Sequence, residues 1–386
     1  MREFMSAKSA ATPRSVIREF VGKSFKYDNV LSFGFGQPDF QTPKHITDAM
    51  KASIDRGESF YAPNTGIIEL RQAISESYKK RGLDYNVNEM VVCVGAISAL
   101  LLAMEAALDI GDEVIISDPC YAAYEGLIMM LGCKPVKVRV YEEDGFIYNA
   151  DAVRAAITDK TKVILLNSPS NPTGGVANYE QVKALAEICV EKDIFCISDE
   201  MYRELLWVDE PYTSIASFPG MKERCILIDG FSKTYAMTGA RLGYAAGPQH
   251  MIEKMIMLLE NVFSSVFTAV QWGGVAALTS SQDCVEEMKA LYRHRKALLV
   301  EGLNSIDGVS CKDPAGAFYL FANIKSTGMD SRTFAEKLLD QEKMLVIPGV
   351  GFGEGGEGFV RLCYATNDEN IKDGVERLAR FMKTIK

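Results

Sequence analysis

Histidine is scarce in this sequence, with three residues among 386, and the nine cysteines include no pair with the two-residue spacing of a zinc site. No histidine stands next to a cysteine, aspartate or glutamate. These absences argue against a metal site and against serine–histidine–aspartate catalysis. Because the cysteines are odd in number and lie mostly in apolar runs, we expect buried free thiols rather than disulfides.

Positive charge is not in excess either. Lysine and arginine total 42, against 51 aspartate and glutamate residues, and the net charge is −9. A surface for nucleic-acid phosphates or for an anionic membrane usually needs a basic run, and the sequence has none. The sequence therefore predicts no nucleic-acid partner.

Long apolar runs are limited to one stretch, residues 90–108 (MVVCVGAISALLLAMEAAL). It carries Gly95, Ser98 and Glu105, so a short strand, a glycine turn and a buried helix explain it better than a membrane span. The first residues, MREFMSAKSAATPRS, lack the apolar core of a secretory signal. We expect a cytoplasmic protein with no membrane partner.

Short apolar runs alternate with helical periodicity from residue 90 onward, which is typical of a mostly parallel sheet buried on both faces. The runs are residues 91–94, 113–117, 135–140, 163–167, 194–198, 225–229 and 243–246. The clearest helical segment between them is 179–191, and later strands are expected at 318–322, 344–347 and 359–365. We predict an α/β fold with a large domain, residues 46–285, and a smaller α+β domain built from residues 1–45 and 286–386.

A glycine-rich run, GVGFGEGGEG at residues 349–358, contains the spacing G-x-G-x-x-G. In a dinucleotide-binding fold this motif opens a helix whose N-terminus receives the pyrophosphate. Here a strand-like segment, FVRLCYA, follows instead. The run is therefore interpreted as a loop between two strands.

Polar side chains follow three of the predicted strands. The segments are NSPSNPTG (167–174), DEMY (199–202) and FSKTYAMTGARLGY (231–244). Because strand ends of such a sheet face one crevice, we expect five of their side chains to converge there. They are Asn171, Asp199, Tyr202, Lys233 and Arg241.

These residue types suit one kind of chemistry. A lysine amine can form a Schiff base with a carbonyl cofactor, and a carboxylate beneath a pyridine ring would keep the ring nitrogen protonated. Arg241, Ser232 and a helix N-terminus at residues 95–98 would supply hydrogen-bond donors and positive potential for a phosphate.

Seven segments together resemble the class I/II aminotransferases, which are pyridoxal-5′-phosphate (PLP) enzymes of fold type I. In chain order they are GFGQPDF, YAPNTGIIELRQAI, VGAISAL, NSPSNPTG, SDEMY, SKTYAMTGARLGY and FVRLCYA. The resemblance covers nearly the whole chain. It implies a mostly parallel seven-stranded sheet in the large domain and PLP as the cofactor.

For the chemistry, the resemblance implies that Lys233 forms the Schiff base and then acts as the base that moves the substrate proton. Asp199 would pair with the pyridinium nitrogen, while Asn171 and Tyr202 would hold the phenolic oxygen. Arg361 would clamp the substrate α-carboxylate through a bidentate pair, which a lysine cannot reproduce. Asn171 and the backbone of Gly36 would assist it.

For the cofactor phosphate, the resemblance implies a second group of contacts. Ser232, Arg241 and the backbone amides of Ala96 and Ile97 would bind it. Tyr121 stands where an aromatic ring stacks on the cofactor, although plain core packing is an alternative. Tyr61 would reach the phosphate of the neighbouring subunit, which implies a homodimer with shared active sites.

The sequence thus predicts an aminotransferase that moves the amino group of an L-amino acid to a 2-oxo acid, usually 2-oxoglutarate, by a ping-pong mechanism. One alternative keeps the cofactor but cleaves carbon–sulfur bonds, as a β-lyase does without an acceptor. Another is a regulator that carries such a domain behind a DNA-binding one. No basic helix-turn-helix segment precedes residue 30, so the regulator is not expected.

Overall fold

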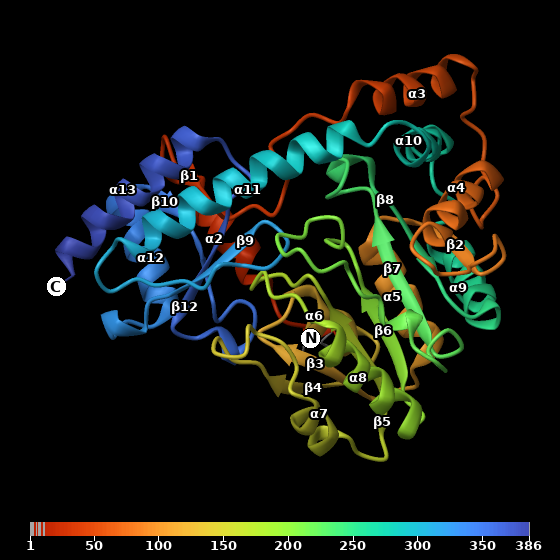
Figure 1. Ribbon diagram of the computed structural model, residues 1–386, viewed down its shortest axis with the longest axis horizontal. Helices are drawn as coiled ribbons and strands as arrows, with labels where there is room; N and C mark the ends of the chain where they lie inside the picture. The colour runs from red at the N-terminus through yellow and green to blue at the C-terminus, as the bar shows by residue number, and fades with distance from the viewer. Residues whose placement is uncertain (1–3, 5, 7–8, 11, 386) are drawn as a thin grey trace.

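A seven-stranded sheet forms the centre of the protein in a computed structural model, which describes residues 4, 6, 9–10 and 12–385 (Figure 1). Its spatial order is β2-β8-β7-β6-β5-β3-β4, and only β8 runs antiparallel to its neighbours. The strands are β2 (Met90–Val94), β3 (Glu113–Asp118), β4 (Lys134–Arg139), β5 (Thr161–Asn167), β6 (Phe195–Asp199), β7 (Cys225–Gly230) and β8 (Leu242–Ala246). The predicted mostly parallel sheet is confirmed.

Both faces of this sheet are buried, because alternate side chains of its strands, except the edge strand β4, enter different apolar clusters. On β7, Leu227 packs in one cluster, while Ile226 and Ile228 pack in the other. One face is covered by α5 (Ala96–Ala107), α6 (Ala123–Met130) and α9 (Gln249–Val262). The other is covered by α4 (Ile68–Lys79), α7 (Ala150–Ala156) and α8 (Tyr179–Glu191).

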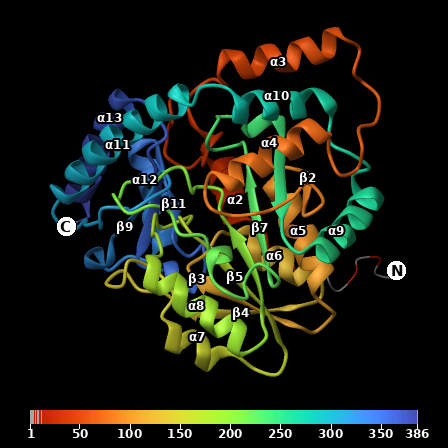
Figure 2. The ribbon, with the colours of Figure 1, turned by 45° about the vertical axis from the view of Figure 1, so that its right-hand side comes forward.

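Helices α3 (Lys44–Asp55) and α10 (Thr268–Thr279) lie side by side, and α10 also packs against α4 (Figure 2). Gly273 of α10 makes this close packing possible, since a Cβ there would lie 2.7 Å from Cγ of Met50. No helix in the described ranges is long and apolar enough to cross a membrane. All nine cysteines are free, as expected.

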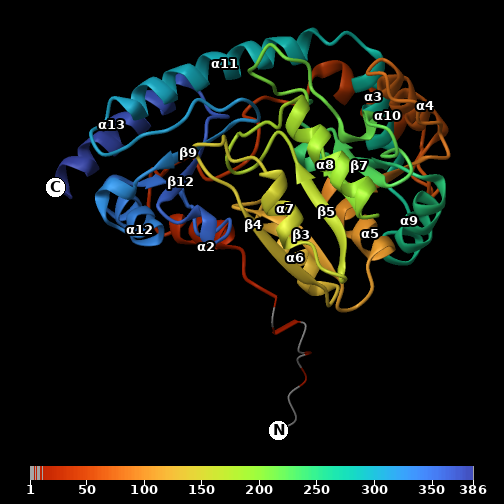
Figure 3. The ribbon, with the colours of Figure 1, turned by 60° about the horizontal axis from the view of Figure 1, so that its bottom comes forward.

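A smaller antiparallel sheet, β11-β12-β9, lies in the C-terminal part, which the long helix α11 (Asp283–Asn304) joins to the large sheet (Figures 1 and 3). Its strands are β9 (Tyr319–Asn323), β11 (Ile347–Pro348) and β12 (Phe359–Cys363). Helices α2 (Val16–Ser24) and α12 (Ser331–Glu342) pack against it, and α13 (Asp368–Thr384) packs against α11 and α12.

The N-terminal segment joins the C-terminal part through β1 (Leu31–Ser32), which pairs in parallel with β10 (Met344–Leu345). The expected single strand at 344–347 was wrong, because the chain changes partner after Leu345 and continues as β11 against β12. The glycine-rich segment links β11 to β12, as the sequence predicted. On the pairing of β1 with β10 we propose the division into a large domain, 46–285, and a small domain, 1–45 with 286–386.

Candidate active site

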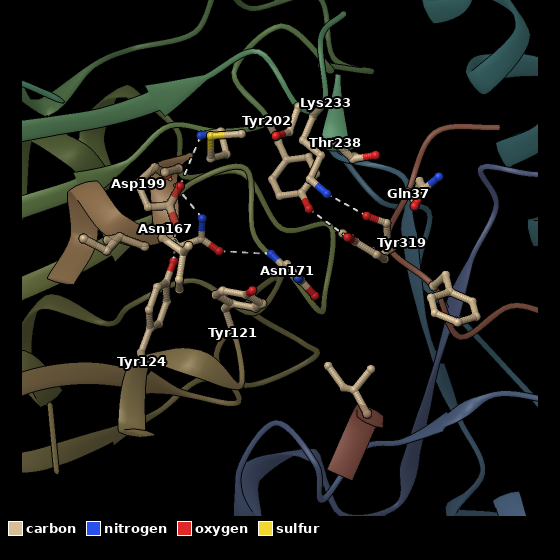
Figure 4. Close-up of a pocket in the computed structure, with 18 of the residues that line it drawn as sticks. Gln37, Tyr121, Tyr124, Asn167, Asn171, Asp199, Tyr202, Lys233, Thr238 and Tyr319 are labelled. Atoms are coloured by element: carbon tan, nitrogen blue, oxygen red, sulfur yellow. Dashed lines mark hydrogen bonds between the residues drawn. The ribbon is translucent and has the colours of Figure 1, made fainter. Parts of the chain in front are cut away.

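A cavity of about 320 Å³ opens where the large sheet meets the C-terminal part (Figure 4). Its walls come from the carboxyl ends of β5 to β7, the start of α5, the segment 34–37, β9 and β12. Every site residue predicted from the sequence lines this cavity, except Tyr61. Those present are Gly36, Ala96, Ile97, Tyr121, Asn171, Asp199, Tyr202, Ser232, Lys233, Arg241 and Arg361.

Lys233 follows β7 and extends its amine across the cavity. Its Nζ donates a hydrogen bond of 2.6 Å to the carbonyl oxygen of Gly36, on the opposite wall. Burial, which disfavours the charged form, lowers the pKa of Lys233 to about 8. An amine with this pKa is neutral often enough near pH 7 to act as a nucleophile or a base.

Asp199 is the last residue of β6, and it is buried in the wall of the cavity. Its Oδ2 accepts a 2.6 Å hydrogen bond from the hydroxyl of Tyr124, and its Oδ1 accepts a 3.2 Å bond from the backbone amide of Met201. Burial raises the pKa of Asp199 to about 6, and these two hydrogen bonds oppose that rise. The carboxylate therefore stays mostly ionised at neutral pH and is available to a cationic partner.

Arg361, in the middle of β12, is only 2% exposed. Its Nη1 donates to Oδ1 of Asn171 at 3.0 Å, and its Nη2 donates to the carbonyl oxygen of Gly34 at 2.5 Å. The guanidinium also lies against the Tyr319 ring, 4.6 Å from its centroid. Its Nε has no hydrogen-bond partner in the described part of the chain. No carboxylate pairs with this buried charge there, and an arginine buried in this way suits an anionic ligand.

The turn from β2 into α5 places an uncapped helix start beside Arg241. Gly95 has a φ of +75°, and a Cβ at this position would lie 2.5 Å from Nη2 of Arg241. No side chain caps the N-terminus of α5 in the described structure, so the amides of Ala96 and Ile97 can serve a ligand. The hydroxyl of Ser232 lines the same cavity. These donors and the guanidinium suit a phosphate.

Tyrosines make up much of the remaining wall. Tyr202 and Tyr319 share a hydrogen bond of 2.7 Å between their hydroxyls (Figure 4). Tyr121 stands edge-on to Tyr124, with ring centroids 5.4 Å apart. A Cβ at Gly36 would lie 2.1 Å from the Tyr319 hydroxyl, so only glycine lets this segment approach so closely.

Tyr61 does not line the cavity. It lies between α3 and α4, and its side chain is 88% exposed. Its predicted partner belongs to a neighbouring subunit, so its role stays a proposal.

The sequence reasoning missed Tyr124 and Tyr319. Tyr124 had a signal, because it stands three residues after Tyr121 and a helical turn places such residues on one face. Tyr319 had none, since it lies in an apolar strand and its contact with Tyr202 joins positions far apart in the chain.

A buried carboxylate, a lysine of lowered pKa and a group of donors that suits a phosphate, all at one end of a mostly parallel sheet, are the features of a fold type I enzyme. The chain belongs to the family of class I and II aminotransferases, whose model matches residues 28–378. This confirms the resemblance drawn from the seven motifs. Members of this family use PLP.

Individual relatives agree with this assignment. The aspartate aminotransferase of Pyrococcus horikoshii is 39% identical, over 98% of this chain and 97% of its own length. The solved structure of the Thermus thermophilus aspartate aminotransferase with maleate is similar, with a TM-score of 0.94, 36% identity and coverage of 99% of this chain and 100% of that one. An aromatic aminotransferase of Pyrococcus horikoshii has a TM-score of 0.90, 39% identity and coverage of 95% and 99%.

Proposed function

We propose that this chain is a PLP-dependent aminotransferase of the aspartate/aromatic type that moves the amino group of an L-amino acid to a 2-oxo acid, with 2-oxoglutarate as the usual acceptor. The observation that carries the proposal is one cavity that presents the amine of Lys233 together with the guanidinium of Arg361, whose Nε has no hydrogen-bond partner among the described residues. A substrate with an amino group and an α-carboxylate needs both.

The residues of the cavity fit PLP by charge and by hydrogen bonding. Arg241, Ser232 and the α5 amides would hold its phosphate, and Asp199 would pair with its ring nitrogen. Tyr202 and Asn171 would donate to its phenolic oxygen, and Tyr121 would lie against the ring. When bound, PLP supplies an aldehyde that condenses with amines and a pyridinium ring that withdraws electrons.

Lys233 would attach the cofactor and would later move the proton at the substrate Cα. Its amine is tethered to the Gly36 carbonyl, and its pKa of about 8 lets it both take and return a proton near neutral pH. Arg361 would hold the α-carboxylate in a bidentate pair, and this fixes which substituent of the Cα faces the lysine.

Each half of a ping-pong exchange would use the same pair of groups, Lys233 and Arg361, because the amino acid and the oxo acid both carry an α-carboxylate.

We further propose a homodimer in which Tyr61 of each subunit reaches the phosphate site of the other. Its exposure of 88% among the described residues supports this role, since it leaves the ring free to contact another subunit.

Chemical trapping tests the assignment of Lys233. PLP-loaded protein treated with borohydride should carry the reduced cofactor on Lys233, located by peptide mass mapping. The variant Lys233→Ala should still bind PLP but should not become labelled. Label on another lysine, or no label after PLP is supplied, would overturn the proposal.

Acceptor dependence separates transamination from the carbon–sulfur lyase alternative. With an amino acid donor, turnover should require a 2-oxo acid and should stop after one equivalent when the acceptor is left out. Continuous release of pyruvate and ammonia from a cysteine conjugate without acceptor would instead indicate the lyase.

A further inference from the structure

The substrate end of the cavity contains few charged groups. Its described lining includes three cations, Lys233, Arg241 and Arg361. Arg241 lies against Gly95 at the start of α5, and Arg361 bonds Asn171 and Gly34. In the proposed function each of these cations is therefore already assigned, and none remains for a second carboxylate on the substrate.

Part of the remaining wall is apolar, and Gln37 and Thr238, which also line the cavity, carry no charge. Ile17 of α2, Phe35 of the segment 34–37 and Ile97 of α5 all line it. Phe35 is 52% exposed, and Ile17 and Ile97 are partly exposed. Exposed apolar side chains at the mouth of a ligand cavity gain free energy when an apolar ligand group covers them. A carboxylate at the same place would lose water without gaining a partner.

We propose that this wall is the subsite for the substrate side chain and that it selects apolar donors, aromatic ones above all, over aspartate. The inference rests on the proposed aminotransferase function and names its donor class. It places Ile97 and Phe35 as specificity-determining residues.

An acceptor with two carboxylates, such as 2-oxoglutarate, also has to bind beside this apolar wall, and Arg18 could hold its second carboxylate. It follows Ile17 in the first turns of α2 and is exposed at the rim, outside the cavity lining. Its charge also acts on Tyr121, where it opposes the rise in pKa caused by burial. A long, flexible arginine there can meet the distal carboxylate of 2-oxoglutarate, whereas the shorter aspartate side chain ends against the apolar wall.

Donor kinetics with the PLP-loaded enzyme give the main test. With 2-oxoglutarate as acceptor, kcat/KM for phenylalanine should exceed that for aspartate by at least about tenfold. The variant Ile97→Lys should reverse or erase this preference, because it adds a cation to the wall. Ile97→Met, of similar reach and without charge, should keep it.

The Arg18→Met variant tests the rim. It should raise KM for 2-oxoglutarate several-fold and leave the single-turnover half-reaction with phenylalanine within about twofold. Equal losses of rate in the phenylalanine and 2-oxoglutarate half-reactions would mean that Arg18 does not bind the distal carboxylate.

Binding of unreactive acids gives a readout that does not depend on turnover. The holoenzyme should bind 3-phenylpropionate at least about tenfold more tightly than succinate, measured by spectral titration. Tighter binding of succinate, or a wild-type preference for aspartate, would overturn the apolar subsite while leaving the aminotransferase proposal intact. If no amino acid supported turnover, the proposed function itself would fail.

Discussion

At the scale of single residues, burial moves two titratable groups toward neutrality from opposite directions. The pKa of Asp199 rises to about 6 and that of Lys233 falls to about 8, in both cases chiefly because the charged form is desolvated. Groups shifted in this way within a cavity are typical of catalytic sites. The hydrogen bond from Tyr124 keeps the Asp199 carboxylate ionised despite its burial.

Removing the Tyr124 hydroxyl should shift the pH dependence of the reaction. In Tyr124→Phe the carboxylate of Asp199 loses its 2.6 Å hydrogen bond, so its pKa should rise by about one unit. Because the proposed chemistry needs ionised Asp199, the acid limb of the single-turnover rate with an amino acid should move to higher pH by a similar amount.

Tyr148→Phe provides a matched control for this variant. Tyr148 is also buried, and its hydroxyl donates to the carbonyl oxygen of Leu165, not to a group of the cavity. Both variants should lose about 1 kcal/mol of stability, but only Tyr124→Phe should shift the pH profile. An acid limb that stays in place, or that moves equally in the control, would contradict the role of Tyr124.

The sequence could predict individual site residues where a polar side chain ends an apolar strand. Asp199 and Lys233 stand out in this way, and the cavity contains both. Tyr319 could not be identified from the sequence, because it lies in an apolar strand and looks like an ordinary core residue. Its hydrogen bond to Tyr202 forms only in the folded protein. Residues that position other side chains are therefore harder to predict from the sequence than residues proposed to contact the ligand.

At the scale of elements, the turn between β2 and α5 links the large sheet to the proposed phosphate site. Gly95 adopts a left-handed φ and brings the backbone against Arg241. Gly243 on β8 packs against the same turn. A Cβ at this position would lie 2.4 Å from the amide nitrogen of Ala96. Strand pairing and the proposed phosphate site thus depend on the same close approach.

The variant Gly95→Ala should weaken PLP binding more than it destabilises the fold. The left-handed backbone would cost about 1–2 kcal/mol, and the new methyl group would displace the Arg241 guanidinium. We expect the dissociation constant for PLP, measured by titration of the apoenzyme, to rise at least about tenfold.

Gly111→Ala separates backbone strain from contact with the arginine. Gly111 has a φ of +93° and open space where a Cβ would stand. This control should lower the melting temperature to a similar degree and leave the PLP dissociation constant unchanged. Equal PLP affinities in the two variants would show that the Gly95 turn does not shape the phosphate site.

Element positions were predictable where apolar runs are short and bounded by turns. The helix expected at 179–191 matches α8 residue for residue, and its start is fixed by a capping box between Asn178 and Gln181. The run 344–347 was misread because its apolar pattern is continuous while its pairing is not. Hydrophobicity predicts burial, but the partner of a strand depends on the whole fold.

At the scale of the whole molecule, an exposed apolar patch supports the proposed dimer. We group in it Phe60, Tyr61, Val262 and Phe267, each more than half exposed, because they belong to two segments that contact each other. The two segments that carry it are joined by a 2.6 Å hydrogen bond from Asn64 to Glu260. Exposed apolar side chains gathered in this way are typical of an interaction surface, and they include the tyrosine proposed to act on the neighbouring subunit.

Hybrid dimers give a direct test of shared active sites. Lys233→Ala should be inactive, and Tyr61→Ala should bind PLP poorly and turn over slowly. If Tyr61 serves the neighbouring subunit, a hybrid dimer contains one complete site, with Lys233 from one subunit and Tyr61 from the other. Refolding an equal mixture should then restore about one quarter of the wild-type activity at limiting PLP, because about half of the dimers are hybrids with one intact site each. If Tyr61 acted within its own subunit, every hybrid site would lack one residue, and the mixture would show only the average of the two variants.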